Sequence, residues 1–165
     1  QWMTDPKIAG VGAFGDLGTH VLDLLLWFFS DVESVSATFT KVYNQYPNCE
    51  ESGEALIKFK SGLIASIAAG WIDIAQPYTI FVSGTKAHAR TTNEKLIINE
   101  DKDGKKIERI EENLPETLPH AFDLFLNSLI DNNTKNLVTP SEAALRSSIM
   151  ESIYQSEKEK KWINI

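Results

Sequence analysis

The chain has 165 residues, and 16 basic against 23 acidic side chains give it a formal net charge of −7. This length predicts one domain, with a core that needs no metal or disulfide to hold it. The acidic balance disfavours nucleic acid and anionic membrane as main partners, because both attract clustered positive charge. The lone cysteine, Cys49, excludes an internal disulfide and a cysteine-based zinc site.

A glycine-rich segment, 11–15, precedes a predicted helix over residues 16–29. One apolar face of this helix consists of Leu17, Val21, Leu24, Leu25 and Phe28. A second stripe beside it consists of Asp16, His20, Asp23 and Trp27. Because residues 22, 26 and 29 are apolar as well, we expect the helix to be covered on more than one side. Its most apolar stretch, 21–29, is interrupted by Asp23 and is shorter than the ~20 residues of a membrane span. We also expect no signal peptide.

A series of strands follows this helix. Apolar and polar residues alternate over 35–43 and 55–60, which predicts half-buried strands. Ser61-Gly62 predicts a tight hairpin into a strand over 63–72, whose two apolar faces we expect to be covered. Further strands are predicted over 78–83, 86–91, 95–99 and 106–110, with Asp103-Gly104 as a second hairpin turn.

Two helices and a short strand complete the chain. A helix is predicted from Ala121, and the run Thr139-Pro140-Ser141-Glu142 has the cap, proline and glutamate of a second helix start. That helix should reach about Glu157, and 162–165 can return as a strand. Segregated helices and strands predict an α+β fold, not a doubly wound sheet. No Gly-x-Gly-x-x-Gly follows a predicted strand, so we expect no dinucleotide site within the chain.

The strongest chemical candidate is the pair formed by Asp16 and His20. Residues four apart on a helix lie on one face, and histidine exchanges protons near neutral pH. The glycines beside the pair would let a ligand approach the backbone closely. A structural role is the alternative, because an aspartate before a helix is a common N-cap and a buried histidine often bonds a carbonyl. His120 is a further candidate for binding substrate, whereas the tryptophans at 2, 71 and 162 are most simply core or interface anchors.

These same residues carry a resemblance to a known family. The runs WMTDP at 2–6 and AGVGAFGDLGTHVLDLLLW at 9–27 resemble the glucose–fructose oxidoreductase / inositol dehydrogenase (Gfo/Idh/MocA) family. The family has a Gly-Gly-Gly segment at this place, and this sequence departs from it with a valine at the centre, in Gly10-Val11-Gly12. Segments 61–65, 84–87 and 139–156 resemble the same family in the same order.

The resemblance implies a single C-terminal substrate-binding and oligomerisation domain over 1–165. Its fold would be an open, mostly antiparallel sheet with helices on one face, like the C-terminal domain of dihydrodipicolinate reductase. The family's Rossmann domain, which holds NAD or NADP and supplies a catalytic lysine, is not in this chain. His20 matches the family's general acid/base, and Asp16 matches the carboxylate that holds substrate and histidine.

The resemblance also implies a sugar or polyol substrate for an NAD(P)-dependent oxidoreductase acting on CH–OH groups. The chain alone is then expected to be inactive, to work with its own Rossmann domain, and to form a homodimer or homotetramer through its sheet face. We expect no metal, no nucleic acid or membrane partner, and a cytoplasmic location. Two alternatives stay open: a sugar sensor or regulator that has lost the reaction, and a module that only dimerises.

Overall fold

The computed structural model describes residues 4–46, 48–74, 79–92 and 95–165. Two compact units make up the chain. Unit 1 contains Gln1–Ile72 and Val138–Ile165, and unit 2 contains Asp73–Leu137. The expectation of a single domain stays a prediction, and each unit is described by itself.

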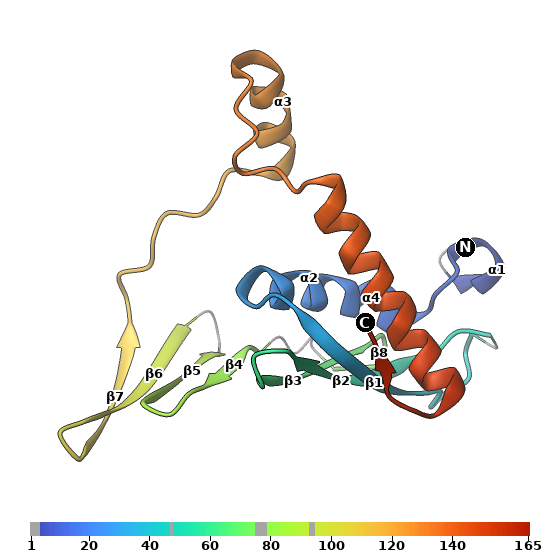
Figure 1. Ribbon diagram of the computed structural model, residues 1–165, viewed down its shortest axis with the longest axis horizontal. Helices are drawn as coiled ribbons and strands as arrows, with labels where there is room; N and C mark the ends of the chain where they lie inside the picture. Colours follow the sequence, from blue (N-terminus) through green and yellow to red (C-terminus); the bar gives the residue numbers. More distant parts are fainter. Residues whose placement is uncertain (1–3, 47, 75–78, 93–94) are drawn as a thin grey trace. The chain divides into compact units, whose positions relative to one another are not determined.

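Unit 1 consists of one sheet and the helices that cover it. Its strands are β1 (Val32–Thr40), β2 (Ser52–Phe59), β3 (Ile64–Gly70) and β8 (Ile163–Asn164), in the order β3-β2-β1-β8. Its helices are α1 (Pro6–Ala9), the π-helical turn η2 (Phe14–Gly18), α2 (Thr19–Phe28) and α4 (Pro140–Glu159). Helices α2 and α4 lie on the same face of this sheet (Figure 1).

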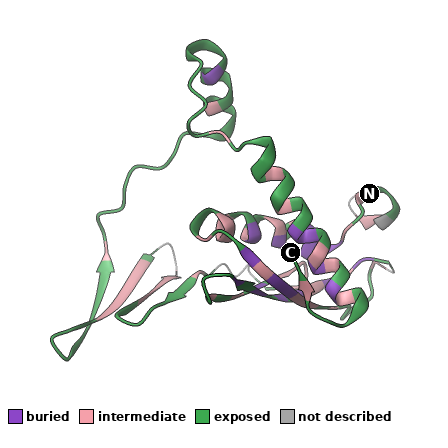
Figure 2. Ribbon diagram, in the orientation of Figure 1, coloured by how far each residue is buried: buried purple, intermediate pink, exposed green. Residues whose placement is uncertain are grey.

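The core of unit 1 lies between that face and the two helices. Strand β2 shows the reason, because its alternate residues Ala55, Ile57 and Phe59 are buried while Leu56 and Lys58 are exposed. Burying each large apolar side chain contributes about 1.5–3 kcal/mol. The buried apolar cluster contains Phe14, Leu22, Val32, Val35, Ala55, Ile57, Phe59, Ile67, Ile149, Met150 and Ile153. Buried residues are purple in Figure 2.

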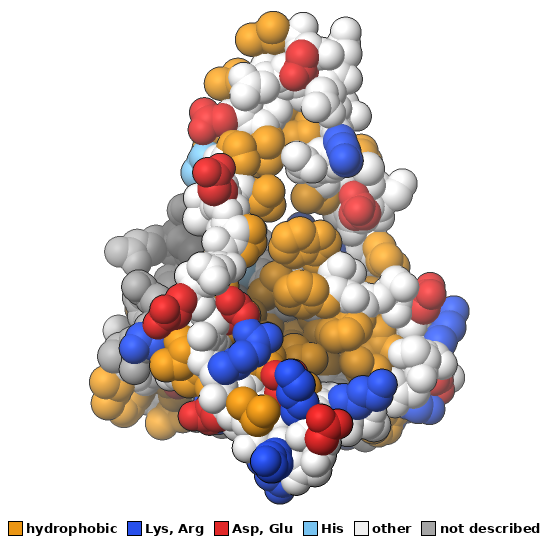
Figure 3. Space-filling model, turned by 90° about the vertical axis from the view of Figure 1, so that its left-hand side faces the viewer, with side chains coloured by type: hydrophobic (Ala, Val, Ile, Leu, Met, Phe, Trp, Pro, Cys, Tyr) orange, Lys and Arg blue, Asp and Glu red, His pale blue; other side chains and the backbone are white. Residues whose placement is uncertain are grey.

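Unit 2 has a second four-stranded sheet and one helix. The strands are β4 (Phe81–Ser83), β5 (Ala87–Thr92), β6 (Lys95–Lys102) and β7 (Lys105–Glu111), in chain order across the sheet, and the helix is α3 (Ala121–Asp131). At the β6–β7 turn, Asp103 and Gly104 have φ of 54° and 78°, as a tight hairpin requires. Hydrophobic side chains of α3 lie on its surface, seen at the top of Figure 3.

The predicted α+β class is confirmed, and every strand pair among the described residues is antiparallel. The strands form two sheets where the sequence suggested one. The predicted start of α4 is confirmed in detail: Thr139 Oγ1 accepts from Glu142 N, and the Glu142 carboxylate accepts from Thr139 N. Residue 78, predicted as the first of its strand, lies outside the described residues.

Two expectations about coverage are wrong within this chain. Helix α2 buries only Leu22 fully, while Trp27 and Phe28 are 72% and 56% exposed. Strand β3 buries Ile67 on the helix side, but Ile64 on the opposite side is 69% exposed. The reason is the same in both cases: α2 and α4 lie on one side of the sheet, so each element keeps one face bare (Figure 1).

The segment Lys7–Phe28 is long and apolar enough, by length and composition, to span a membrane. This segment is longer than 21–29, the most apolar stretch of the sequence. In the structure, Gly10 takes a φ of +78° and separates α1 from η2. Phe14 and Leu22 are fully buried in the core of unit 1. Only 28% of its apolar window is buried in the structure, and length and composition alone are weak evidence for a membrane span.

Candidate functional site

The glycine-rich segment allows the backbone before η2 to approach Glu50. Gly12 N donates to Glu50 Oε1 over 2.9 Å, and Ala13 N donates to Glu50 O over 2.9 Å. A Cβ atom at Gly12 would lie 2.5 Å from Glu50 O, so a side chain at this position would push the two segments apart. The glycine at position 12 therefore permits the contact between Glu50 and the segment that leads into η2.

Gly15 likewise allows a close approach, in this case of η2 to Val11 and Tyr154. A Cβ atom there would lie 2.6 Å from Tyr154 Oη and 2.3 Å from Val11 Cβ. The room that the glycine leaves is filled by the chain's own atoms. The expectation that a ligand approaches the backbone at Gly15 and Gly18 is therefore wrong, because both residues are buried against protein.

Asp16 lies in η2, and its side chain is held by Trp71, which directly follows β3. Its Oδ2 accepts a hydrogen bond from Trp71 Nε1 over 3.0 Å. Its backbone N donates to Gly12 O over 3.0 Å. The N-cap position of η2 is Ala13, with no side-chain cap bond. Asp16 is therefore not the N-cap of η2, although its bond to Trp71 is a structural contact, and its role at a substrate stays a prediction. π-Helical turns occur frequently at functional sites.

His20 lies in the first turn of α2, and its side chain is exposed. Within the described residues, no hydrogen bond or ion pair joins His20 to Asp16 or to another side chain. The histidine is not sealed in the core and does not bond a carbonyl. The structure therefore leaves the imidazole free to meet an incoming molecule, but the carboxylate of Asp16 does not hold it directly.

The stripe that the sequence predicts beside the apolar face is the outward edge of this helix. Asp23 and Trp27 are exposed like His20. Asp23 Oδ1 lies 3.9 Å from Arg146 Nη1 of α4, a weak solvent-exposed ion pair. This edge offers a carboxylate, an imidazole and an indole to whatever lies against it.

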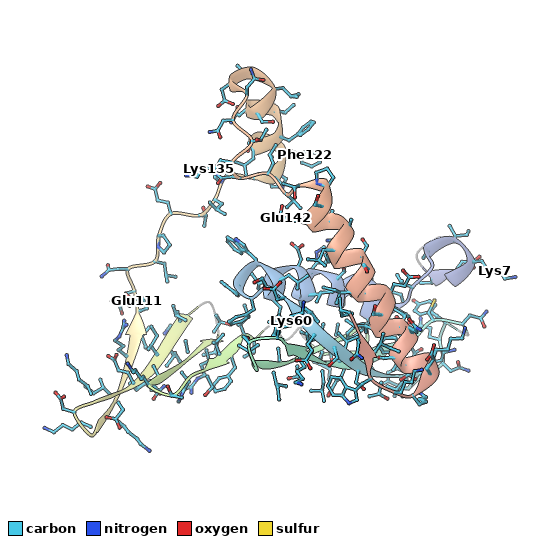
Figure 4. The ribbon with its side chains drawn as sticks, viewed as in Figure 1. Lys7, Lys60, Glu111, Phe122, Lys135 and Glu142 are labelled. Atoms are coloured by element: carbon cyan, nitrogen blue, oxygen red, sulfur yellow. The ribbon has the colours of Figure 1, made fainter. Side chains whose placement is uncertain are left out.

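His120, the further candidate for binding substrate, caps a helix, and its role at a substrate stays a prediction. It belongs to unit 2 and occupies the N-cap position of α3, where its Nδ1 accepts from Phe122 N over 3.3 Å. Its ring stacks on that of Phe122, which Figure 4 labels at the start of α3. A local capping role accounts for these contacts.

A buried carboxylate that the sequence analysis missed lies close to Trp71. Glu51 is 1% exposed and accepts four backbone hydrogen bonds, from Val42, Tyr43, Asn44 and Gln45, over 2.7–3.2 Å. Burial alone would raise the pKa of Glu51, but these four donors outweigh it and hold the pKa below its usual range. Residue 51 continues the alternation of the buried residues 53, 55, 57 and 59. This alternation is the feature of the sequence from which the burial of Glu51 could have been predicted.

A second unpredicted contact joins Glu50 to α4. Tyr154 Oη donates to Glu50 Oε1 over 2.5 Å, and the tyrosine ring packs edge-on against Phe39 at 4.9 Å. Burial raises the pKa of Tyr154 well above its usual range, and the neighbouring Glu50 carboxylate adds to this shift. A pocket of unit 1 is lined by Glu50 and Tyr154, but not by Asp16 or His20.

The described strands do not form a dinucleotide site of the Rossmann type. Such a site needs parallel strands joined through a helix, and these strands pair only antiparallel. No group of three or more histidine, cysteine, aspartate or glutamate residues in the described part of the chain could hold a metal ion.

Known proteins share both the sequence pattern and the fold. Residues 1–90 match the GFO/IDH/MocA C-terminal domain family. Oxidoreductase P35 of Formosa agariphila is 39% identical over 63 residues, which are 38% of this chain and 19% of that protein. Confirmation of the family resemblance therefore comes from the glycine-rich segment, η2, α2 and the first strands.

Solved structures extend the likeness in fold to the whole chain. Levoglucosan dehydrogenase in complex with NADH has a TM-score of 0.80 and 17% identity, covering 100% of this chain and 53% of that one. The aldose-aldose oxidoreductase of Caulobacter crescentus, complexed with glycerol, has a TM-score of 0.78 and 17% identity, covering 100% of this chain and 51% of that one. This chain thus spans about half the length of these solved relatives. It belongs to the GFO/IDH/MocA C-terminal domain family.

Proposed function

We propose that this chain is the substrate-binding and oligomerisation domain of an NAD(P)-dependent oxidoreductase that acts on CH–OH groups of sugars or cyclitols. In this proposal His20 is the general acid/base, and Asp16 binds a substrate hydroxyl. The observation that carries it is the outward edge of η2 and α2, where His20 is exposed and Asp16 is anchored by Trp71. Membership of an oxidoreductase family supports the reaction class.

The chemistry assigned to the two side chains is complementary. Oxidation of an alcohol releases the hydroxyl proton, and an exposed imidazole accepts a proton near neutral pH. The Asp16 carboxylate has two oxygens, of which Oδ2 takes the Trp71 donor. Oδ1 is then available to accept from a neighbouring hydroxyl of a polyol, which would hold the reacting carbon beside His20.

The redox half of the reaction is assigned to a part of the enzyme outside this chain. A nicotinamide dinucleotide accepts or gives the hydride in such enzymes. Because the described strands form no Rossmann-type site, we assign the cofactor to a separate dinucleotide-binding domain. The chain by itself is therefore expected to be inactive, and a cytoplasmic location is part of the same proposal.

The role in oligomerisation rests on the bare face of the unit 1 sheet. Leu56 and Ile64 on this face are 45% and 69% exposed. Leu56 lies opposite Ser66, and Ile64 lies opposite the exposed Lys58. Exposed apolar side chains rimmed by polar residues are typical of a protein interface. We assign it to contact with a second copy of the chain.

The test uses the complete protein, which joins this chain to a dinucleotide-binding domain. Turnover of a panel of sugars and cyclitols is measured with NAD and NADP. The proposal expects cofactor-dependent oxidation of at least one polyol, and a loss of ~10²–10⁴-fold in kcat for His20→Ala. His88→Ala is the matched control, because His88 lies in β5 of unit 2 and should leave kcat unchanged. Binding without turnover in the unaltered protein would contradict an enzyme and indicate a sensor.

A further inference from the structure

Trp71 joins the candidate site to the segments that pack around it. Its indole Nε1 donates to Asp16 Oδ2 over 3.0 Å, across 55 positions of sequence. Asp16 is partly buried, and this is the hydrogen bond that its carboxylate makes within the described part of the chain. The indole N–H of a partly buried tryptophan needs a hydrogen-bond partner, and at Trp71 that partner is the carboxylate of the candidate site.

Trp71 is itself fixed by neighbours on two sides. Its backbone N donates to Glu51 O over 2.9 Å, which ties the residue to the start of β2. Its ring meets that of Tyr46 edge-on, with centroids 5.7 Å apart at 86°. The indole therefore cannot swing away from Asp16 without breaking its packing.

The buried carboxylate of Glu51 holds the segment that carries Tyr46. Four successive amides, from Val42 to Gln45, donate to its two oxygens, so this segment has little freedom. The same residue's main chain accepts from Trp71. Glu51 thus braces the segment before Tyr46 through its side chain and Trp71 through its main chain.

We infer that Trp71 is a positioning residue for the substrate: it holds Asp16 by one oxygen, so that the other oxygen points a hydroxyl of the polyol toward His20. This inference rests on the function proposed above for Asp16 and His20. Without the indole N–H, the Asp16 side chain would be free to change rotamer, and a misplaced carboxylate weakens catalysis even when it is present.

The test is a double-mutant cycle in the complete enzyme, with Trp71→Phe, Asp16→Ala and the double variant. Trp71→Phe removes the N–H but keeps a ring against Tyr46. We expect it to lower kcat/KM at least tenfold, the worth of a hydrogen bond to a charged group, and to have little further effect in Asp16→Ala. Trp162→Phe is the matched control, since Trp162 is half exposed and should leave kcat/KM unchanged.

An equal loss from Trp71→Phe in both backgrounds would overturn the inference, since that is what a purely structural role gives. No loss in either background would overturn it as well. Exchange of the Trp71 indole hydrogen, followed by NMR, separates this inference from the proposed function. We expect exchange to be roughly tenfold faster in Asp16→Ala. If Asp16→Ala leaves turnover intact, the proposed function fails, and unchanged indole exchange would show that Trp71 does not hold Asp16.

Discussion

Tyr154 of α4 donates a hydrogen bond of 2.5 Å to Glu50, which precedes β2. The backbone amide of Gly12 donates to the same carboxylate oxygen from a third segment. One carboxylate oxygen thus accepts from two donors that lie far apart in sequence. The contact fixes the segment that leads into η2, and therefore bears on where Asp16 is held.

Replacing Tyr154 with phenylalanine should destabilise the chain. The change removes the hydroxyl donor and leaves a partly buried carboxylate with one bond fewer, which costs about 1–3 kcal/mol. Urea unfolding measures the free energy. Tyr43→Phe is the control, because Tyr43 is 74% exposed and should change stability by less than about 0.5 kcal/mol. Equal stabilities for the two variants would contradict the role of the Tyr154–Glu50 bond.

Glu51→Gln should lower the thermal midpoint, because an amide cannot accept from all four backbone donors as a carboxylate does. The pKa of Glu51 is lowered in the folded state, so its stabilisation is present above its unfolded value of about 4.3 and is lost as pH falls toward the folded value. The difference between wild type and Glu51→Gln should therefore be largest near neutral pH and shrink in acid.

Glu54→Gln provides the comparison for this pH series, because Glu54 is exposed on the same strand. Melting curves of all three proteins between about pH 7 and 3 give the answer. A gap between wild type and Glu51→Gln that stays constant over this range would show that the carboxylate charge is not what the four amides recognise.

Gly12→Ala should destabilise the chain by about 1–3 kcal/mol, because the new methyl group meets backbone that cannot move freely. Its Cβ atom would lie 2.5 Å from the carbonyl oxygen of Glu50. In Gly18→Ala the φ is −64° and Cβ would lie 3.4 Å from the Phe14 ring, so its stability should stay close to that of wild type. Denaturant melts compare the two. If Gly12→Ala were as stable as Gly18→Ala, the close approach would not matter.

Leu56→Lys tests the sheet face as the contact between copies. Leu56 is 45% exposed on the face opposite α2 and α4, so a charge there should leave the fold intact and lower the sedimentation mass. Phe122→Lys puts the same charge on α3, at a side chain that is 72% exposed, and should leave the mass unchanged. If only Phe122→Lys lowered the sedimentation mass, the assignment of the interface to the unit 1 sheet would be wrong.

Local patterns allowed much of the fold to be predicted. The alternation at Ala55, Ile57 and Phe59, the Asp103-Gly104 turn and the Thr139–Glu142 capping box each depend on neighbours within a few residues. Such features are encoded locally, and the structure confirms them.

The contacts around the candidate site could not be predicted in the same way. The Trp71–Asp16 bond spans 55 residues and the Tyr154–Glu50 bond spans 104, so both depend on how the strands and helices pack. The π-helical turn at η2 and the close approach of Gly12 to Glu50 are likewise revealed by no periodicity of the sequence. The sequence identified Asp16 and His20, but not what anchors Asp16.

Chemical rescue of His20→Ala in the complete enzyme distinguishes an imidazole that transfers the substrate proton from one with a structural role. If the exposed imidazole of His20 is the group that takes the hydroxyl proton, kcat for a polyol should fall by ~10²–10⁴-fold and rise again when free imidazole is added to the assay. Glycerol or a sulfate salt at the same concentration should restore nothing. An unaltered kcat in His20→Ala, or a lowered one that imidazole leaves unchanged, would contradict the claim.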